Sequence, residues 1–367
     1  MKLFMMSDAS NVHTQRWVSA LAGRGMEIML FSLSVKGVEF YDKFKNVTCV
    51  SFGYDSLTKK KCGGNTFSKL KYLNTLGFIK KHIKEFAPDF VHAHFASSYG
   101  LLGALAGKHP YIISMWGSDV YYFPRISPLH RWILKYNLSC ADVVLSTSHV
   151  MSAETKLYTN KEPLITPFGV DIEKFSPMEV NRDGDEIVIG TVKTLLPVYG
   201  IDVLIKSFAL VKKALPGKKL RLIIAGEGKE KESLEALCVE LGVRENVDFV
   251  GRIANDKVPE FISRMDVFVA LSRNESFGVA VLEAMACGVP VVVSDADGFR
   301  EVVKDGVTGY IVPREDAKAA ADRILTLLND ASMARTMGQE GRKHVVENYN
   351  WEASVDTMMR VYETYNK

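Results

Sequence analysis

The chain has 367 residues, of which 47% are hydrophobic and 24% are charged, and its formal net charge at pH 7 is +3. This length is too great for one ordinary core and suits two domains, while the composition excludes a disordered protein. No stretch approaches the roughly 20 apolar residues of a membrane-spanning helix, and the apolar start at Leu3–Met6 is too short for a signal peptide.

The cysteines and the distribution of charge indicate the environment of the protein. The five cysteines are scattered and never spaced as Cys-x-x-Cys, so they predict neither a disulfide framework nor a structural zinc site, and we expect a cytoplasmic location. Residues 1–176 hold 21 Lys and Arg against 13 Asp and Glu, whereas the remainder holds 25 against 30. This basic first half is either an ordinary solvated surface or a surface attracted to an anionic acceptor or to anionic lipid at the inner face of the cell membrane. We expect no nucleic-acid partner.

In chain order, strand-like runs and helical stretches alternate through the first half. Strands are expected at Lys2–Met6, Glu27–Leu33, Asp89–His92, Tyr111–Ser114 and Asp142–Ser146, with a helix at Thr14–Arg24. The run Lys59–Lys61 and the segment Lys69–Phe86 combine lysines with apolar residues. They indicate either an ordinary amphipathic helix on a core or a surface that addresses the acceptor.

A break at Pro163–Gly184, rich in proline, glycine and polar residues, separates the two halves, and the alternation then resumes. Strands are expected at Ile187–Thr191, Lys219–Ala225, Asp248–Val250, Val267–Ala270 and Pro290–Ser294, and helices at Ile201–Leu215, Lys229–Leu241 and Asp316–Asn329. The pattern predicts two doubly wound α/β domains with parallel sheets. Ligands of such sheets bind outside the carboxyl ends of the strands.

The most specific motif runs from Arg273 to Pro290, directly after an expected strand. We expect a helix to begin near Ser276, where the amides of Ser276, Phe277 and Gly278, continuing to Val279, offer an anion site suited to a diphosphate. Glu275 is placed to reach sugar hydroxyls, and Glu283 to accept hydrogen bonds from vicinal hydroxyls such as those of ribose. The alternative is that Glu275 only caps the helix and Glu283 is a solvated residue.

A second cluster follows two strands of the first half. His92-Ala93-His94 ends one strand, and Trp116-Gly117-Ser118-Asp119 follows the next. Histidine and aspartate at neighbouring strand ends orient hydroxyls or move protons, so His94 and Asp119 are candidate catalytic residues. The alternative is that both satisfy local backbone groups.

The motif Glu-Ser-Phe-Gly-x-x-x-x-Glu-Ala-Met-Ala-x-Gly-x-Pro-Val resembles that of the retaining GT-B glycosyltransferases of family four, the glycosyl transferases group 1. The resemblance covers essentially the whole chain. It implies a GT-B fold of two Rossmann-like domains facing a central cleft. The expected parts are an acceptor-binding domain at 1–168, a linker at 169–186, a nucleotide-sugar-binding domain at 187–347, and residues 348–367, whose helix at Trp351–Tyr365 packs back toward the first domain.

The resemblance also implies roles for single residues. Glu275 would contact the donor hexose and Glu283 the donor ribose, and the loop after Gly251 would cover the nucleobase. Further donor-side candidates are Arg252, Ile253, Thr191, Asn11 and His13. The acceptor-side candidates are Trp116, Tyr121 and Tyr122.

Two positions depart from the pattern of the family. Lys193 stands where relatives often have an arginine for the diphosphate, and Val198 and Tyr199 occupy the region of a second cation. Trp116 replaces a histidine that touches the donor sugar in many relatives.

Together these features predict a retaining hexosyltransferase that uses a UDP- or GDP-linked sugar and needs no metal or other cofactor. The expected acceptor is a cell-surface glycan, a lipid-linked sugar or another glycoconjugate precursor, as in polysaccharide biosynthesis. One alternative is a nucleotide-sugar epimerase or hydrolase of the same fold. Another is an inactive nucleotide-sugar-binding subunit of a transferase complex.

Overall fold

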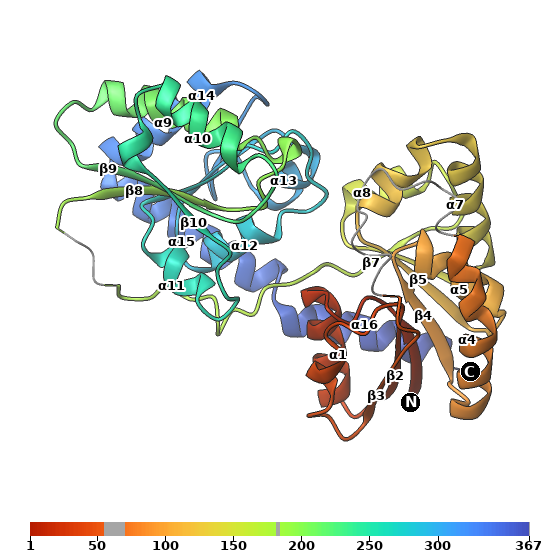
Figure 1. The fold of residues 1–367 in the computed structure, drawn as a ribbon. Coiled ribbons are helices and arrows are strands. Elements are labelled where there is room, and N and C mark those ends of the chain that lie inside the picture. The colour runs from red at the N-terminus through yellow and green to blue at the C-terminus, as the bar shows by residue number, and fades with distance from the viewer. Residues whose placement is uncertain (55–69, 181–183, 367) are drawn as a thin grey trace. The chain divides into compact units, whose positions relative to one another are not determined.

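A computed structural model describes residues 1–54, 70–180 and 184–366 (Figure 1). The chain divides into two compact units. Unit 1 contains Met1–Phe168 and the chain from Ser354 onward, and unit 2 contains Gly169–Ala353. Each unit is a parallel β-sheet with helices on both faces, the arrangement that alternating strands and helices produce.

In its described residues, unit 1 has a seven-stranded sheet of order β3-β2-β1-β4-β5-β6-β7. The strands are β1 (Lys2–Met6), β2 (Glu27–Ser32), β3 (Val47–Ser51), β4 (Phe90–His94), β5 (Tyr111–Met115), β6 (Val143–Ser146) and β7 (Leu164–Ile165). Strands β1, β4, β5 and β6 are almost entirely buried, as parallel strands with helices on both faces must be. Their carboxyl ends meet along one edge of the sheet.

The helices of unit 1 cover both faces of this sheet. They are α1 (Val12–Gly23), α4 (Leu76–Phe86), α5 (Ser98–Ala106), α6 (Ser118–Tyr121), α7 (Pro128–Cys140) and α8 (His149–Thr155), with the 3-10 turns η1 (Val38–Tyr41), η2 (Leu70–Thr75) and η3 (Phe123–Arg125). Side chains of α4, α5 and α7 join the core on one face. Figure 1 shows α1 and α16 (Trp351–Tyr365) against the other face.

Most of helix α16 belongs to unit 1, although it follows unit 2 in the chain. The ring of Tyr362 stacks on Phe90 of β4, with ring centroids 4.7 Å apart. Its hydroxyl is hydrogen-bonded to Nδ1 of His92 at 2.7 Å. All three side chains are fully buried, so α16 completes the core of unit 1.

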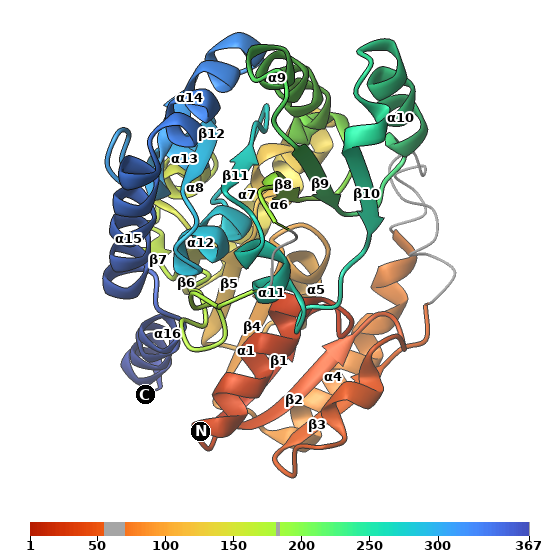
Figure 2. The ribbon, with the colours of Figure 1, turned by 90° about the vertical axis from the view of Figure 1, so that its left-hand side faces the viewer.

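Unit 2, as far as it is described, has a six-stranded parallel sheet of order β10-β9-β8-β11-β12-β13, most of which Figure 2 shows in sequence. The strands are β8 (Ile187–Val192), β9 (Leu220–Ala225), β10 (Val247–Gly251), β11 (Val267–Ala270), β12 (Val291–Ser294) and β13 (Tyr310–Val312). Its helices are α9 (Ile201–Ala214), α10 (Lys231–Glu240), α11 (Val258–Ser263), α12 (Val279–Ala286), α13 (Asp297–Val302), α14 (Ala317–Asn329) and α15 (Ala331–Asn348), with the turns η4 (Pro197–Tyr199) and η5 (Arg244–Asn246). Side chains of α9, α10 and α14 form the core on one face.

The structure differs from the sequence prediction in several elements. Strands β3, β7 and β13 were not expected, and β7 lies inside the predicted break at Pro163–Gly184. The amphipathic segment begins as the 3-10 turn η2 before α4, and Lys59–Lys61 lies outside the described residues. Among the described helices, none is both long and apolar enough to cross a membrane.

Candidate functional site

The motif residues of unit 2 gather at the carboxyl ends of its strands, in what we term the lysine–glutamate cluster: Lys193, Tyr199, Glu275 and Glu283. Lys193 directly follows β8, and Glu275 lies in the loop between β11 and α12. The Lys193 Nζ is 2.5 Å from Oε2 of Glu275 and 4.4 Å from the centroid of the Tyr199 ring. The side chains of Lys193 and Glu275 are only 19% and 11% exposed.

The neighbours of Lys193 keep its ammonium charged. Burial alone would lower the pKa of Lys193, but Glu275, Tyr199 and Glu283 together raise it above its ordinary value. Lys193 is therefore a fixed positive charge next to a fixed carboxylate. Such a pair is suited to hold an anion on one side and hydroxyl groups on the other.

Close backbone contacts position the loop that bears Glu275. The amide of Gly298 in α13 donates to the carbonyl of Glu275 at 3.0 Å. A Cβ at Gly298 would lie 2.4 Å from the Phe277 nitrogen and 2.6 Å from the Ser276 carbonyl carbon. Only glycine fits here. A Cβ at Gly226 would similarly lie 1.9 Å from the carbonyl oxygen of Lys193, and Gly226 also has a φ of +148°.

Arg273 connects the same loop to η4. Its guanidinium makes a bidentate pair with Asp202 of α9 at 3.0 and 2.9 Å, and it also contacts Glu315 and the carbonyl of Pro197. The amide of Arg273 donates to the carbonyl of Val198 at 2.8 Å. Because η4 ends at Tyr199, these bonds hold the Tyr199 ring beside Lys193. Sequence reasoning assigned Arg273 no role, since Asp202 is 71 residues away along the chain.

Helix α12 begins at Val279 and not near Ser276, so this prediction was wrong by about one turn. Gly278 has a φ of +104°, which ends the preceding turn and starts the helix after it. The amides that the start of α12 offers therefore include those of Gly278 and Val279, whereas the Ser276 amide lies 3.3 Å from Oε1 of Glu275. The Phe277 side chain is 2% exposed and packs edge-on to Tyr349.

The remaining donor-side candidates of unit 2 occupy different environments. Thr191 is the last residue but one of β8, and its side chain is buried, at 1% exposed. Arg252 is exposed and Ile253 is partly exposed, directly after Gly251, the last residue of β10. Glu283 is partly buried in the second turn of α12.

In unit 1, the candidates at the carboxyl ends of β1, β4 and β5 form an aromatic group. Its members are the candidates His13, His94 and Trp116, together with Phe168, which follows β7 and was not among the predicted site residues. The ring of His13 stacks on Phe168 with centroids 4.2 Å apart, and Trp116 lies 4.4 Å from His94 and 5.3 Å from Phe168. Asn11 caps α1 by accepting from the amide of His13 at 2.8 Å. Asn11 therefore fixes His13 within this aromatic group.

Phe95 also belongs to this region, although sequence reasoning did not identify it. It directly follows His94, and its ring lies 4.8 Å from Trp116. Its φ is +66°, a left-handed conformation that is costly for an aromatic residue. Such strain is most often retained near functional sites.

The buried histidines of this region are neutral. Burial lowers the pKa of His92 from 6.5 to about 3, and it holds the pKa of His94 well below 6.5. Burial and the charge of Arg16 lower the pKa of His13 to about 4. Nδ1 of His94 is hydrogen-bonded to Ser7 at 3.2 Å, which in turn bonds Thr14 at 2.7 Å. An uncharged imidazole such as His94 can donate or accept a hydrogen bond but brings no positive charge.

The Asp119 carboxylate is hydrogen-bonded to backbone amides. It accepts from the amides of Ala96 at 2.8 Å, Gly117 at 2.9 Å and Trp116 at 3.1 Å. Burial raises the pKa of Asp119 above its ordinary value, although these three hydrogen bonds act in the opposite direction. Since Asp119 is 1% exposed, it joins the loops after β4 and β5. This is the alternative that the sequence left open, in which the group satisfies local backbone.

The two acceptor-side tyrosines lie just after this loop. Tyr121 is partly buried against the core of unit 1, and Tyr122 is 71% exposed. They therefore face different surroundings and do not form one surface.

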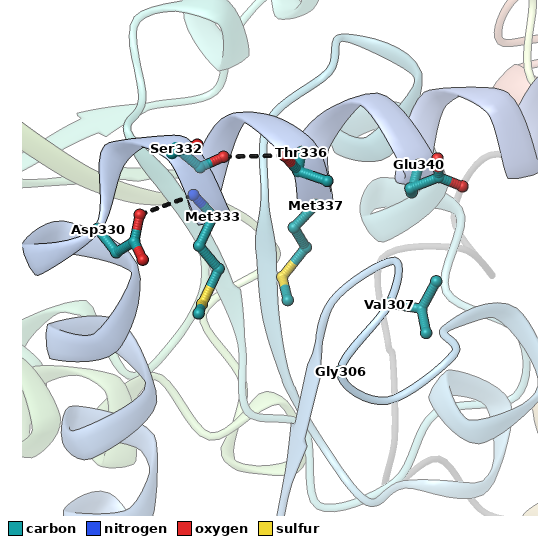
Figure 3. A pocket seen from close by; sticks show the side chains of 8 residues that line it. All are labelled: Gly306, Val307, Asp330, Ser332, Met333, Thr336, Met337 and Glu340. Carbon is teal, nitrogen blue, oxygen red and sulfur yellow. Dashed lines mark hydrogen bonds between the residues drawn. The ribbon is translucent and has the colours of Figure 1, made fainter.

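A hollow of about 410 Å³ lies elsewhere in unit 2, beside α15 (Figure 3). It is lined by Gly306, Val307, Asp330, Ser332, Met333, Thr336, Met337 and Glu340, and includes no residue of the lysine–glutamate cluster. The carboxylate of Asp330 accepts from the amide of Met333, and the backbone carbonyl of Ser332 accepts from the hydroxyl of Thr336. We assign no function to this hollow.

No group of His, Cys, Asp and Glu suited to hold a metal occurs within the described ranges. Asp295-Ala296-Asp297 has the Asp-x-Asp pattern of some metal-binding sites, but its two aspartates have other roles here. Asp295 binds Arg314 at 2.9 Å and Arg300 at 3.2 Å, and Asp297 begins α13.

Two family profiles match the chain. The profile described as "Glycosyl transferases group 1" matches residues 173–344, and "Glycosyl transferase 4-like" matches residues 2–148. Between them they include the lysine–glutamate cluster and most of the aromatic group. The chain belongs to the group 1 glycosyltransferases.

Individual relatives and solved structures agree with this assignment. The chain is 28% identical over 360 residues to the GDP-mannose-dependent alpha-(1-6)-phosphatidylinositol monomannoside mannosyltransferase of Mycolicibacterium smegmatis, covering 92% of this chain and 91% of that protein. The structure of a sucrose-phosphate synthase from Thermosynechococcus elongatus matches with a TM-score of 0.84 and 22% identity over 99% of this chain and 98% of that one. HepE from Anabaena, in complex with UDP and glucose, matches with a TM-score of 0.76 and 17% identity over 99% of this chain and 100% of that chain. Both structural likenesses concern the fold, which is therefore GT-B.

Proposed function

We propose that this glycosyltransferase is a retaining, metal-independent hexosyltransferase that uses a UDP- or GDP-linked sugar. The observation that favours this proposal most is the ion pair between Lys193, directly after β8, and Glu275, in the loop that leads to α12. Names of relatives point to the same donors, since one is a GDP-mannose-dependent enzyme and another was crystallised with UDP and glucose.

In the proposed reaction, the bond between the sugar carbon and the diphosphate oxygen breaks, and the same carbon bonds to an acceptor hydroxyl oxygen, whose proton is released. The departing diphosphate accumulates negative charge. Lys193 and the amides at Gly278 and Val279 stabilise that charge. Glu275 accepts hydrogen bonds from the sugar, and Glu283 accepts them from the ribose. Lys193 alone takes the place of the arginine and lysine found together in many relatives, with Tyr199 beside it.

The proposed acceptor is a glycan, a lipid-linked sugar or another glycoconjugate precursor. The mannosyltransferase relative is named for a phosphatidylinositol-linked acceptor, which is consistent with such a partner. We propose a cytoplasmic protein in peripheral contact with the anionic inner face of the membrane. The basic first half favours that contact, and the free cysteines Cys49, Cys140, Cys238 and Cys287 of the described chain fit a reducing compartment.

A panel of nucleotide sugars, with and without membrane extract, tests the proposed reaction class. Transfer that depends on the extract supports a transferase. Epimerised sugar or slow hydrolysis without an acceptor would indicate an epimerase or hydrolase, and binding without any product would indicate an inactive subunit.

The two glutamates provide a sharper test. Glu275→Gln should lower turnover while nucleoside diphosphate affinity is retained, because the change removes a contact to the sugar and frees Lys193. Glu283→Gln should weaken binding of the nucleoside diphosphate by about ten- to a hundredfold, the worth of one charge-assisted hydrogen bond. Calorimetry with the bare nucleotide and initial rates with the sugar donor measure both. Full turnover in Glu275→Gln would contradict the proposed contact between Glu275 and the sugar.

A further inference from the structure

Helix α7 of unit 1 has apolar side chains on two faces, of which only one is buried. Leu134 and Leu138 enter the core of the unit. On the outer face, Leu129 and Trp132 are 54% and 61% exposed, and the Trp132 ring stacks on Tyr136 with centroids 5.7 Å apart. A helix that lies on protein alone shows polar residues on its outer face.

Exposed apolar residues concentrate around this helix. Within the described residues, seven large hydrophobic side chains are at least half exposed, and five of these lie between Tyr122 and Leu157: Tyr122, Ile126, Leu129, Trp132 and Leu157. Two contacts bring their segments together. Arg125 of η3 binds Glu154 of α8 at 2.8 Å, and Arg131 of α7 lies 5.7 Å from the ring of Tyr158. Scattered exposed hydrophobic residues need no explanation, but a group on one surface indicates a binding site.

Two lysine or arginine side chains accompany this apolar group. Arg131 and Lys135 are exposed on α7, and in the part of the chain that the structure describes neither forms an ion pair with an acidic side chain. The acidic residues nearby are engaged, Glu154 with Arg125 and Glu162 with Lys156. The surface therefore combines an exposed tryptophan with uncompensated positive charge.

We propose that this α7 surface, formed by Tyr122, Ile126, Leu129, Trp132, Leu157, Arg131 and Lys135, docks on an anionic lipid bilayer. Tryptophan and tyrosine are suited to the boundary between headgroups and acyl chains, and the two cations would lie among lipid phosphates. A second copy of the chain fits less well, because a two-fold dimer through this face would oppose like charges. The inference rests on the membrane contact of the proposed function and gives it a location.

Co-sedimentation with phosphatidylcholine vesicles, with and without phosphatidylglycerol, tests the proposal. Binding should require phosphatidylglycerol and weaken as salt is raised. Arg131→Gln with Lys135→Gln should reduce binding by about thirtyfold, since each cation near the surface contributes about fivefold. Leu129→Ser with Trp132→Ser should reduce it by at least about tenfold through the lost apolar burial.

The matched control is Val239→Ser with Leu241→Ser in unit 2, where the wild-type residues are 66% and 36% exposed. This variant should bind vesicles like the wild type, and thermal unfolding should show that all three variants are folded. The α7 proposal is overturned if the wild type does not bind anionic vesicles at low salt, or if both α7 variants bind as well as the control. A dimer in solution that Leu129→Ser with Trp132→Ser dissociates would also overturn it, in favour of a homodimer interface.

Vesicle binding is measured without donor or acceptor, so it is independent of the proposed reaction. Calorimetry with UDP and GDP on the same preparations separates the two. Nucleotide binding without vesicle binding would contradict the α7 surface and the proposed membrane contact but leave the proposed reaction intact. Vesicle binding without nucleotide binding would contradict only the proposed donor.

Discussion

At the scale of single residues, His92 and His94 are neutral imidazoles inside unit 1, and this makes stability depend on pH. Their pKa values in the folded state lie below the ordinary 6.5, so the unfolded chain binds more protons. Stability is therefore lost as pH falls below about 6.5. Together the two should lower the free energy of unfolding by about 3 kcal/mol between about pH 7.5 and about pH 5.5, before most carboxylates titrate.

Urea unfolding at several pH values measures this loss. His92→Asn removes one of the histidines whose pKa is lowered and should reduce the loss of stability over that range by about 1.4 kcal/mol. Its stability at neutral pH will also fall, because the bonds to Tyr362 and Ser114 change. The pH slope, and not the absolute stability, decides the prediction, and an unchanged slope would contradict it.

Site residues that lie close together in the sequence could be predicted as a group, whereas contacts between distant residues could not. Glu275, Ser276 and Glu283 lie in one continuous motif, so they could be identified together. The contact between Lys193 and Glu275 joins residues 82 positions apart. A role at the donor site was predicted for each of them, but their ion pair was not. The stacking of His13 on Phe168 and the backbone bonds of Asp119 likewise require the folded sheet.

At the scale of elements, the contact between α13 and the Glu275 loop leads to a second prediction. Gly298→Ala would push a Cβ against the backbone of Ser276 and Phe277, so the loop and Glu275 must move. We expect a loss of about 1–3 kcal/mol in stability from this overpacking, together with reduced turnover and weaker donor binding. Steady-state kinetics and thermal unfolding measure both effects.

Gly77→Ala is the matched control for Gly298→Ala. No atom lies within 4 Å of a Cβ at Gly77 in α4, so this change should leave kinetics unaltered and stabilise the helix by about 0.5–1 kcal/mol. If Gly298→Ala behaves like Gly77→Ala, then the loop tolerates displacement and α13 does not position it.

Most elements could be predicted because apolar runs and helical periodicity are local properties. The start of α12 was misplaced because the conformation of Gly278 depends on the turn before it, and nothing in the local sequence distinguishes Ser276 from Val279 as the first helical residue. Strand β7 has only two residues, Leu164 and Ile165, and its pairing with β6 is formed by the sheet. A strand of two residues is too short to show a recognisable hydrophobic periodicity.

At the scale of the whole molecule, α16 leads to a third prediction. Tyr362→Phe keeps the stack on Phe90 but loses the bond to His92, which should cost about 1–3 kcal/mol. Tyr362→Ala also leaves a cavity and should cost about 3–5 kcal/mol. Three of the four tryptophans, Trp17, Trp116 and Trp132, lie in unit 1, so tryptophan fluorescence during urea unfolding reports mainly on that unit. If the urea concentration at the midpoint of unfolding is the same in Tyr362→Ala as in the wild type, then α16 is dispensable for the stability of unit 1.

The return of the chain to unit 1 at Ser354 also determines the order in which the units can be completed during synthesis. Unit 2 is continuous from Gly169 to Ala353, so the ribosome releases all of its residues in one stretch. Unit 1 begins first, but Tyr362, whose side chain covers Phe90 and bonds His92, is made only after unit 2. The nascent N-terminal unit must therefore wait, with part of its core uncovered, until unit 2 has been translated in full.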